Sequence, residues 1–199
     1  MLRPARAKHV APKFRKGRIM PSHRKRLHRI EAPGHARYLT CSCYHRLALL
    51  GNPAIRDAFA DQIECVHARS AFRLLAWVVM PEHFHLLLLI PNLPEWTVPK
   101  ILQAVKRPFA QRVIARWRGL AAPILDRLRD ASGVTHFWQR GGGYDRNIVS
   151  DEELYQKIEY LHANPVQRGL IDRPLDWAWS SARWYEGIRE GPITIDHIG

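Results

Sequence analysis

The sequence predicts an α+β protein in which helices pack on the faces of one mainly antiparallel sheet. Short apolar segments with strand composition alternate with longer segments whose apolar residues recur at helical spacing. A proline-containing turn at residues 80–83 joins two of these strands directly, which favours an antiparallel hairpin. The chain has 199 residues, so we expect one hydrophobic core and one folded domain.

Four segments have the composition of strands. They are rich in β-branched, aromatic and other apolar residues and are bounded by turn residues. The predicted strands are residues 35–45, 73–79, 85–90 and 135–140. The glycines at 141–143 follow the last of these strands, and we expect them to form a flexible join.

Three longer segments have helical periodicity. Pro53 suits the first turn of a helix that reaches about Ala68. A second helix is expected from Val98 to about Trp117, with Pro108 kinking or splitting it. The third helix follows Ser150 and Glu153, which form a capping box, and we expect Pro165 to stop it.

Positive charge is concentrated at the start of the chain. The net charge is +13, and residues 1–30 hold 11 Lys or Arg and no Asp or Glu. Such a segment has too little apolar surface to fold by itself, so we interpret it as a mobile basic arm for nucleic acid or as a solubilising tail. The expected organisation is therefore an arm at 1–30, a domain at 31–185 and a tail at 186–199.

Neither a membrane span nor a disulfide framework is expected. The longest apolar runs, 74–81 and 86–91, are far shorter than the roughly 20 residues that cross a bilayer. Three cysteines are an odd number, and the protein is expected to be cytoplasmic. Cys41 and Cys43 would share one face of a strand, where packing is favoured over metal binding.

A second basic surface is expected on the helix that begins at Val98. Its polar side carries six basic residues, which indicate either DNA phosphate contacts or an ordinary solvated face. They are Lys100, Lys106, Arg107, Arg112, Arg116 and Arg118. The candidate DNA-binding residues are Lys100, Lys106, Arg107, Arg112 and Arg116 of this helix, together with Arg140 and Arg146 farther along the chain.

His83-Phe84-His85 is the first candidate for chemistry. Residues two apart in a strand point to the same face, so both imidazoles would project together while Phe84 turns the other way. This pattern can present two nitrogen ligands to one metal ion. By itself it is weak, because the chain has 11 histidines.

Tyr160 and Asn164 are the second candidate. They lie one helical turn apart on one flank of the third helix, beside its apolar stripe. A phenol beside an amide ligand suits a metal-assisted nucleophile, although a packing tyrosine and a helix cap would also explain the pair. Tyr144, next to Asp145 and the glycines, is the rival nucleophile.

Four separated sequence blocks stand out along the chain. They are Val78-Val79-Met80-Pro81-Glu82-His83-Phe84-His85-Leu86-Leu87, Phe137-Trp138-Gln139-Arg140 with Tyr144-Asp145-Arg146, Tyr160-Leu161-His162-Ala163-Asn164-Pro165-Val166, and Trp177-Ala178-Trp179-Ser180-Ser181-Ala182. Together they resemble a known family, the REP-associated tyrosine transposases of the HUH endonuclease superfamily, and the resemblance covers roughly residues 33–185. The triple glycine and the long basic arm depart from the family pattern.

The resemblance implies a fold, a reaction and a role for each matching residue. The fold would be a four- or five-stranded antiparallel sheet with helices on its faces, of the HUH, ferredoxin-like kind. His83, His85 and Asn164 would hold Mg²⁺ or Mn²⁺, and Tyr160 would be the nucleophile. Single-stranded DNA at hairpin-forming repeats would be cleaved and rejoined through a 5′-phosphotyrosine. The protein would be a monomer or a homodimer, and some dimers of the family exchange the tyrosine helix.

Two alternatives remain open at this point. The chain could be a non-catalytic protein that binds a DNA or RNA hairpin through its basic surfaces and its tryptophan-rich tail. It could also carry zinc on Cys41, Cys43, His83 and His85, if their strands are neighbours.

Overall fold

The structure, a computed structural model, describes residues 36–93, 95–141 and 143–197. The predicted basic arm lies outside these residues. The elements in chain order are β1 (Ala36–Ser42), η1 (Tyr44–Arg46), α1 (Pro53–His67), β2 (Arg73–Val79), β3 (His83–Leu89), α2 (Val98–Gly119), α3 (Ile124–Arg127), β4 (Tyr144–Ile148), α4 (Asp151–Gln167), η2 (Pro174–Asp176) and α5 (Ala182–Tyr185). Within the described residues, no helix has the length and apolar character needed to cross a membrane.

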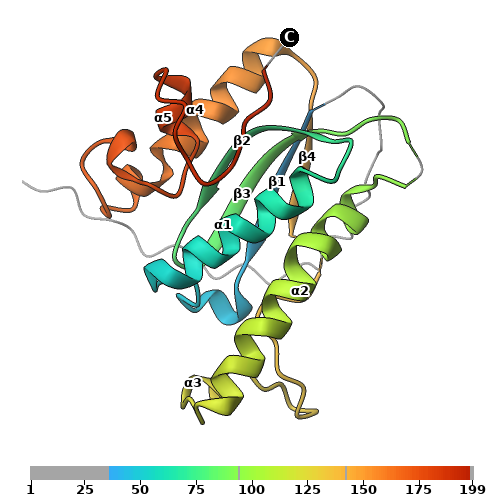
Figure 1. Cartoon of the computed structure of the whole chain (residues 1–199), viewed down its shortest axis with the longest axis vertical. Coiled ribbons are helices and arrows are strands. Elements are labelled where there is room, and N and C mark those ends of the chain that lie inside the picture. The colour runs from blue at the N-terminus through green and yellow to red at the C-terminus, as the bar shows by residue number, and fades with distance from the viewer. Residues whose placement is uncertain (1–35, 94, 142, 198–199) are drawn as a thin grey trace, which may run out of the picture.

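The four strands form one antiparallel sheet in the order β2-β3-β1-β4. This order, with a helix between β1 and β2 and another between β3 and β4, is ferredoxin-like. The predicted α+β class and antiparallel sheet are confirmed. Figure 1 shows α1 and α2 crossing in front of the strands.

Each face of the sheet is covered by its own hydrophobic cluster. On one face, Leu39, Phe84 and Leu86 pack with α1 and α2 around Phe59 and Phe109. The opposite face packs on α4, whose predicted apolar stripe is buried. This second cluster includes Tyr38, Leu87, Leu154, Ile158 and Leu161. The sheet therefore separates a layer of two helices from the layer that contains α4.

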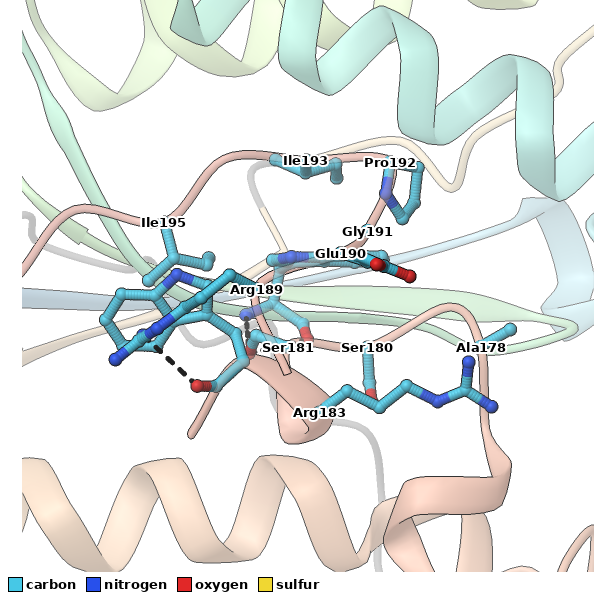
Figure 2. A pocket seen from close by; sticks show the side chains of 12 residues that line it. Ala178, Ser180, Ser181, Arg183, Arg189, Glu190, Gly191, Pro192, Ile193 and Ile195 are labelled. Atoms are coloured by element: carbon cyan, nitrogen blue, oxygen red, sulfur yellow. Dashed lines mark hydrogen bonds between the residues drawn. The ribbon is translucent and has the colours of Figure 1, made fainter. Parts of the chain in front are cut away.

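The chain after α4 covers the free edge of β2. Backbone bonds join Val79 to Trp179 and Trp77 to Ser181, each at 2.9 Å. A small cavity of about 120 Å³ lies beside this edge. Figure 2 shows Ser181 and Ile195 among its walls, and the cavity includes none of the predicted site residues.

The predicted strand at 135–140 is wrong. Thr135 and Trp138 form only isolated bridges, and the fourth strand is β4, Tyr144–Ile148. β4 is an edge strand, and its polar sequence lacks the apolar alternation that marks a half-buried strand. It forms because its backbone pairs with β1 and because Asp145 pairs with the buried Arg37 at 2.6 Å.

Other boundaries also differ from those expected. β1 ends at Ser42, before a 3-10 turn in which His45 and Arg46 have positive φ. α2 is one continuous helix through Pro108. The prediction that Pro165 stops its helix is wrong, because α4 continues to Gln167. Proline removes only its own N–H bond, and the Arg168 N–H still reaches the Asn164 carbonyl at 3.1 Å.

The glycine join makes a close backbone contact. Gly143 has φ +71°, and a β-carbon added there would lie 2.0 Å from the Thr40 carbonyl oxygen. Gly141 has φ +98° and no atom within 4 Å of such a carbon. Glycine at 143 therefore lets the chain enter β4 directly against β1.

Replacing Gly143 with alanine is expected to destabilise the protein more than replacing Gly141. Both changes place a β-carbon on left-handed backbone, at about 1 kcal/mol each. Only Gly143→Ala adds a steric clash, so its total loss in the free energy of unfolding should be about 2–4 kcal/mol. Urea denaturation of the two variants measures the difference, and equal losses would contradict the close contact.

Candidate active site

β3 begins with the paired histidines, and its alternation directs both toward α4. His83 lies opposite Ser42 and His85 opposite Thr40 in the register with β1. Phe84 points to the other face, where its ring lies 4.9 Å from that of Phe59. Both imidazoles are buried. The strand thus presents two ring nitrogens to one point, as the alternation predicts.

Hydrogen bonds hold each imidazole in a defined orientation. His83 Nδ1 lies 3.1 Å from the Glu82 carboxylate, which only accepts, so this nitrogen carries the proton and Nε2 carries a lone pair. His85 Nδ1 lies 2.7 Å from Thr40 Oγ1 and 2.9 Å from the Tyr38 hydroxyl. The two Nε2 atoms face each other at 3.0 Å.

α4 brings the other two predicted residues to the same place. The Asn164 amide is buried, and its Nδ2 lies 3.3 Å from His85 Nε2. One turn earlier, the Tyr160 ring lies 6.4 Å from the His85 ring and is 46% exposed. Tyr160, Asn164, His83 and His85 therefore meet within a single chain.

These residues line an open cavity of about 410 Å³. Three cations surround it: Arg46 from the 3-10 turn, Lys157 from α4 and Arg168 at the end of α4. The Lys157 ammonium lies 5.6 Å from the centre of the Tyr160 ring. Arg168 also pairs with Glu82 and so joins the end of α4 to the turn before His83. The cavity suits an anionic group.

Burial keeps both imidazoles neutral. Burial, with a smaller contribution from the neighbouring His83, lowers the pKa of His85 to about 3. Burial also lowers the pKa of His83, against the opposing effect of the Glu82 carboxylate. Neutral imidazole is the form that binds metal ions.

The donor set fits a divalent cation. Two ligands at about 2.1 Å on adjacent positions of an octahedral ion lie about 3.0 Å apart, which matches the separation of the two Nε2 atoms. The Asn164 amide oxygen takes the place of its nitrogen after a half-turn of the side-chain amide. Glu82 behind His83 is the carboxylate support common behind metal-binding histidines.

Most of the predicted DNA-binding residues lie away from this cavity. Lys100, Lys106, Arg107, Arg112 and Arg116 belong to α2, which packs on the opposite face of the sheet. Arg140 precedes β4 and pairs with Asp130 at 3.6 Å, and Arg146 lies within β4 and pairs with Glu153 at 2.6 Å.

Sequence reasoning missed several residues that surround the imidazoles. Tyr38 and Thr40 reach His85 only through the β1–β3 register, which no local pattern predicts. Arg168 meets Glu82 across 86 residues. Arg46 lines the cavity from a turn in which its own backbone is left-handed, with φ +54°. Glu82, directly before His83, had the clearest local signal, because a carboxylate beside a candidate ligand is a typical support.

The zinc alternative is wrong. Cys41 and Cys43 are buried in the cluster beneath α1 and α2, whereas His83 and His85 face α4 across the sheet. In the β1–β3 register Cys41 lies opposite Phe84, whereas His83 and His85 lie opposite Ser42 and Thr40, so the thiols and the imidazoles are on different faces and cannot share one ion through the sheet. Both thiols pack in the core, as the favoured interpretation predicts.

The tail tryptophans also have structural roles. Trp177 is buried, and its indole N–H donates to the Val79 carbonyl at 3.0 Å. The guanidiniums of Arg56 and Arg189 lie 3.9 Å from the rings of Trp179 and Trp184. These stacked ring faces are not available to DNA or RNA bases.

A ferredoxin-like sheet with paired histidines facing a tyrosine helix is the arrangement that the sequence resemblance implied for a single-tyrosine transposase domain. The family described as "Transposase IS200 like" matches residues 35–164. That span is more than half of the chain, and the protein therefore belongs to the IS200-like transposase family.

Two named relatives are similar over shorter stretches. The REP-associated tyrosine transposase of Escherichia coli K12 is 26% identical over 128 residues, 64% of each chain. A putative REP-associated tyrosine transposase of Haemophilus influenzae is 26% identical over 110 residues, 55% of this chain and 58% of that one. The matches thus span less than two-thirds of either relative.

A solved structure shares the fold over most of its length. It is a REP-associated tyrosine transposase bound to a REP hairpin, with a TM-score of 0.59 and 21% identity. The match covers 90% of this chain and 92% of that chain. At this identity, the likeness establishes the fold.

Acid is expected to destabilise the protein through its buried imidazoles. A histidine in the unfolded chain titrates near 6.5, whereas burial lowers the pKa of folded His85 to about 3. Between these values the unfolded chain binds a proton that the folded chain does not, so the free energy of unfolding falls by up to roughly 1 kcal/mol per pH unit.

Urea denaturation between pH 7 and pH 4, in buffer without divalent ions, measures this loss. His85→Gln should have a shallower pH dependence than the wild type. His197→Gln, which removes an exposed imidazole, is the control and should keep the wild-type dependence. An unchanged slope in His85→Gln would show that the folded protein protonates this ring as readily as the unfolded chain does.

Proposed function

We propose that this protein is a tyrosine transposase that cleaves and rejoins single-stranded DNA at hairpin-forming repeats. One observation carries the proposal: Tyr160 and Asn164 from α4 meet His83 and His85 from β3 at one cavity. Membership of the IS200-like family supports it. The names of the relatives and the hairpin in the solved neighbour support repeats of the REP type as the substrate.

In the proposed reaction, Tyr160 Oη attacks the scissile phosphorus. A bond forms between the phenol oxygen and phosphorus while the bond from phosphorus to the 3′ oxygen breaks. The phenol loses its proton and the departing 3′ oxygen gains one. The products are a 5′-phosphotyrosine and a free 3′-hydroxyl, and attack by another 3′-hydroxyl reverses the exchange and joins strands.

The residues around Tyr160 are suited to a charged phosphate. His83, His85 and Asn164 would hold Mg²⁺ or Mn²⁺, which supplies positive charge to the phosphate oxygens when bound. Lys157, whose ammonium lies 5.6 Å from the centre of the Tyr160 ring, adds positive charge beside the tyrosine. Glu82 and the Tyr38 and Thr40 hydroxyls keep the imidazoles oriented, so little rearrangement is needed during the reaction.

The rival nucleophile, Tyr144, lines the same cavity. Its ring is 47% exposed and lies 6.3 Å from that of Tyr38. Tyr160 is favoured because its ring lies edge-on to the His85 ring, 6.4 Å between centres, and because it lies one helical turn from the amide of Asn164. The two phenols are nearly equally exposed, so each is a matched control for the other.

Tyr160→Phe is expected to abolish the covalent protein–DNA adduct, because phenylalanine has no oxygen to attack phosphorus. Tyr144→Phe should retain adduct formation within about tenfold of the wild type. A labelled hairpin oligonucleotide with a single-stranded flank, followed by denaturing gel electrophoresis, measures the adduct.

Adduct formation by Tyr160→Phe would refute the assignment of the nucleophile. Hairpin binding by the wild type without any adduct, in the presence of Mg²⁺ and Mn²⁺, would instead indicate a non-catalytic binding protein.

His85→Ala is expected to weaken Mn²⁺ binding at least about tenfold, because it removes one of three ligands. Electron paramagnetic resonance of Mn²⁺ titrated with protein measures this binding without requiring activity. His197→Ala, outside the cavity, should bind Mn²⁺ as the wild type does. In parallel, chelation should stop adduct formation by the wild type, and added Mn²⁺ should restore it. Equal Mn²⁺ affinity in all three proteins would contradict the proposed ligand set.

A further inference from the structure

The surface of α2 has a concentration of charge that the candidate active site does not use. Residues 31–199 contain 20 basic and 18 acidic residues, so their net charge is small. Six of these basic residues and none of the acidic ones lie in α2. The excess of basic over acidic residues is therefore concentrated on one helix, where it creates a local positive electrostatic field.

Three of the α2 cations form a stripe along its outer face. Positions 7 and 11 residues apart return to nearly the same direction on a helix with about 100° per residue. Lys100, Arg107 and Arg118 have these spacings, and all three side chains are exposed. Among the residues that the structure describes, Arg107 and Arg118 have no ion-pair partner.

A groove of about 330 Å³ runs beside this stripe. Leu102 and Trp138 provide apolar walls, and Lys106 and Arg107 provide positive charge. The Lys106 ammonium lies 5.7 Å from the centre of the Trp138 ring. Apolar walls beside cations complement a sugar–phosphate backbone, in which an apolar sugar alternates with an anion.

The groove and the candidate active site lie on opposite faces of the sheet but meet at one edge. Gly141 lines the groove, and Tyr144 lines the cavity that contains the imidazoles. They are three positions apart in the chain, so their α-carbons are at most about 11 Å apart. This edge is formed by β4, the last strand of the sheet. A DNA strand can thus pass from one face to the other over a short stretch of chain.

We propose that α2 and its groove bind the duplex stem of the DNA, and that the single strand leaves the stem at Gly141 and enters the active-site cavity beside Tyr144. α2 has 22 residues and is therefore about 33 Å long, close to one turn of duplex DNA. This inference rests on the proposed function, because it names the surface that holds the same substrate.

The test compares two pairs of charge removals in the full chain. Arg107→Gln with Arg118→Gln removes two cations from the α2 stripe. Arg69→Gln with Arg173→Gln removes two exposed cations elsewhere and is the control for the loss of net charge. The N-terminal residues 1–30 are present in every variant, so their contribution to binding cancels in the comparison.

The probes are a fluorescent DNA hairpin with a single-stranded flank and the same flank without a stem. Fluorescence anisotropy at several NaCl concentrations measures binding. For the α2 pair, we expect the hairpin Kd to rise about tenfold. The salt slope, which is the slope of log Kd against the logarithm of the NaCl concentration, should fall by about 2. Binding of the unpaired flank and its adduct yield should equal those of the control pair.

Equal hairpin Kd and salt slope in both pairs would overturn the proposed stem surface. A similar loss of affinity for the unpaired flank would also overturn it, because α2 would then bind single strands. Absence of an adduct even in the wild type, with the hairpin effect present, would refute the proposed chemistry and leave the stem surface standing.

Discussion

The pairing of β1 with β3 is the constraint on which the candidate active site depends. It places His85 beside Thr40 and stacks its ring on that of Tyr38 at 5.3 Å. The same alternation sends Phe84 into the core beneath α1. A slip of one residue would exchange the two faces, burying aromatic surface against α4 and moving the imidazoles away from Tyr160. Stability of the core and geometry of the site therefore select the same register.

Charge in the site is arranged in two layers. The inner layer is neutral at ordinary pH, because burial disfavours the protonated imidazoles. The outer layer is cationic and solvent-accessible, with Arg46, Lys157 and Arg168 around the cavity mouth. An anionic strand is attracted by the outer charges, while the inner nitrogens keep their lone pairs. This separation lets one small cavity serve both phosphate attraction and cation binding.

Much of the site could be predicted from the sequence because its key pairs are local. The histidines need only strand alternation, and Tyr160 and Asn164 need only one helical turn. β4 could not be predicted, since an edge strand is held by backbone pairing and its polar side chains lack an apolar pattern. The α2 cations were evident in the sequence. Their separation from the cavity by the sheet was not, because it depends on which face each helix covers.

Glu82 and Arg168 connect two segments that are distant in the chain. Glu82 supports His83, and Arg168 follows directly after α4, which bears Tyr160 and Asn164. The ion pair thus links the two halves of the site: the β2–β3 turn, which precedes the histidines, and α4, which bears the tyrosine and the amide. For protein engineering, the two halves are not independent modules. A chimaera that joins the β2–β3 hairpin of one relative to the α4 of another must inherit positions 82 and 168 together, or it leaves a buried carboxylate without its counter-ion.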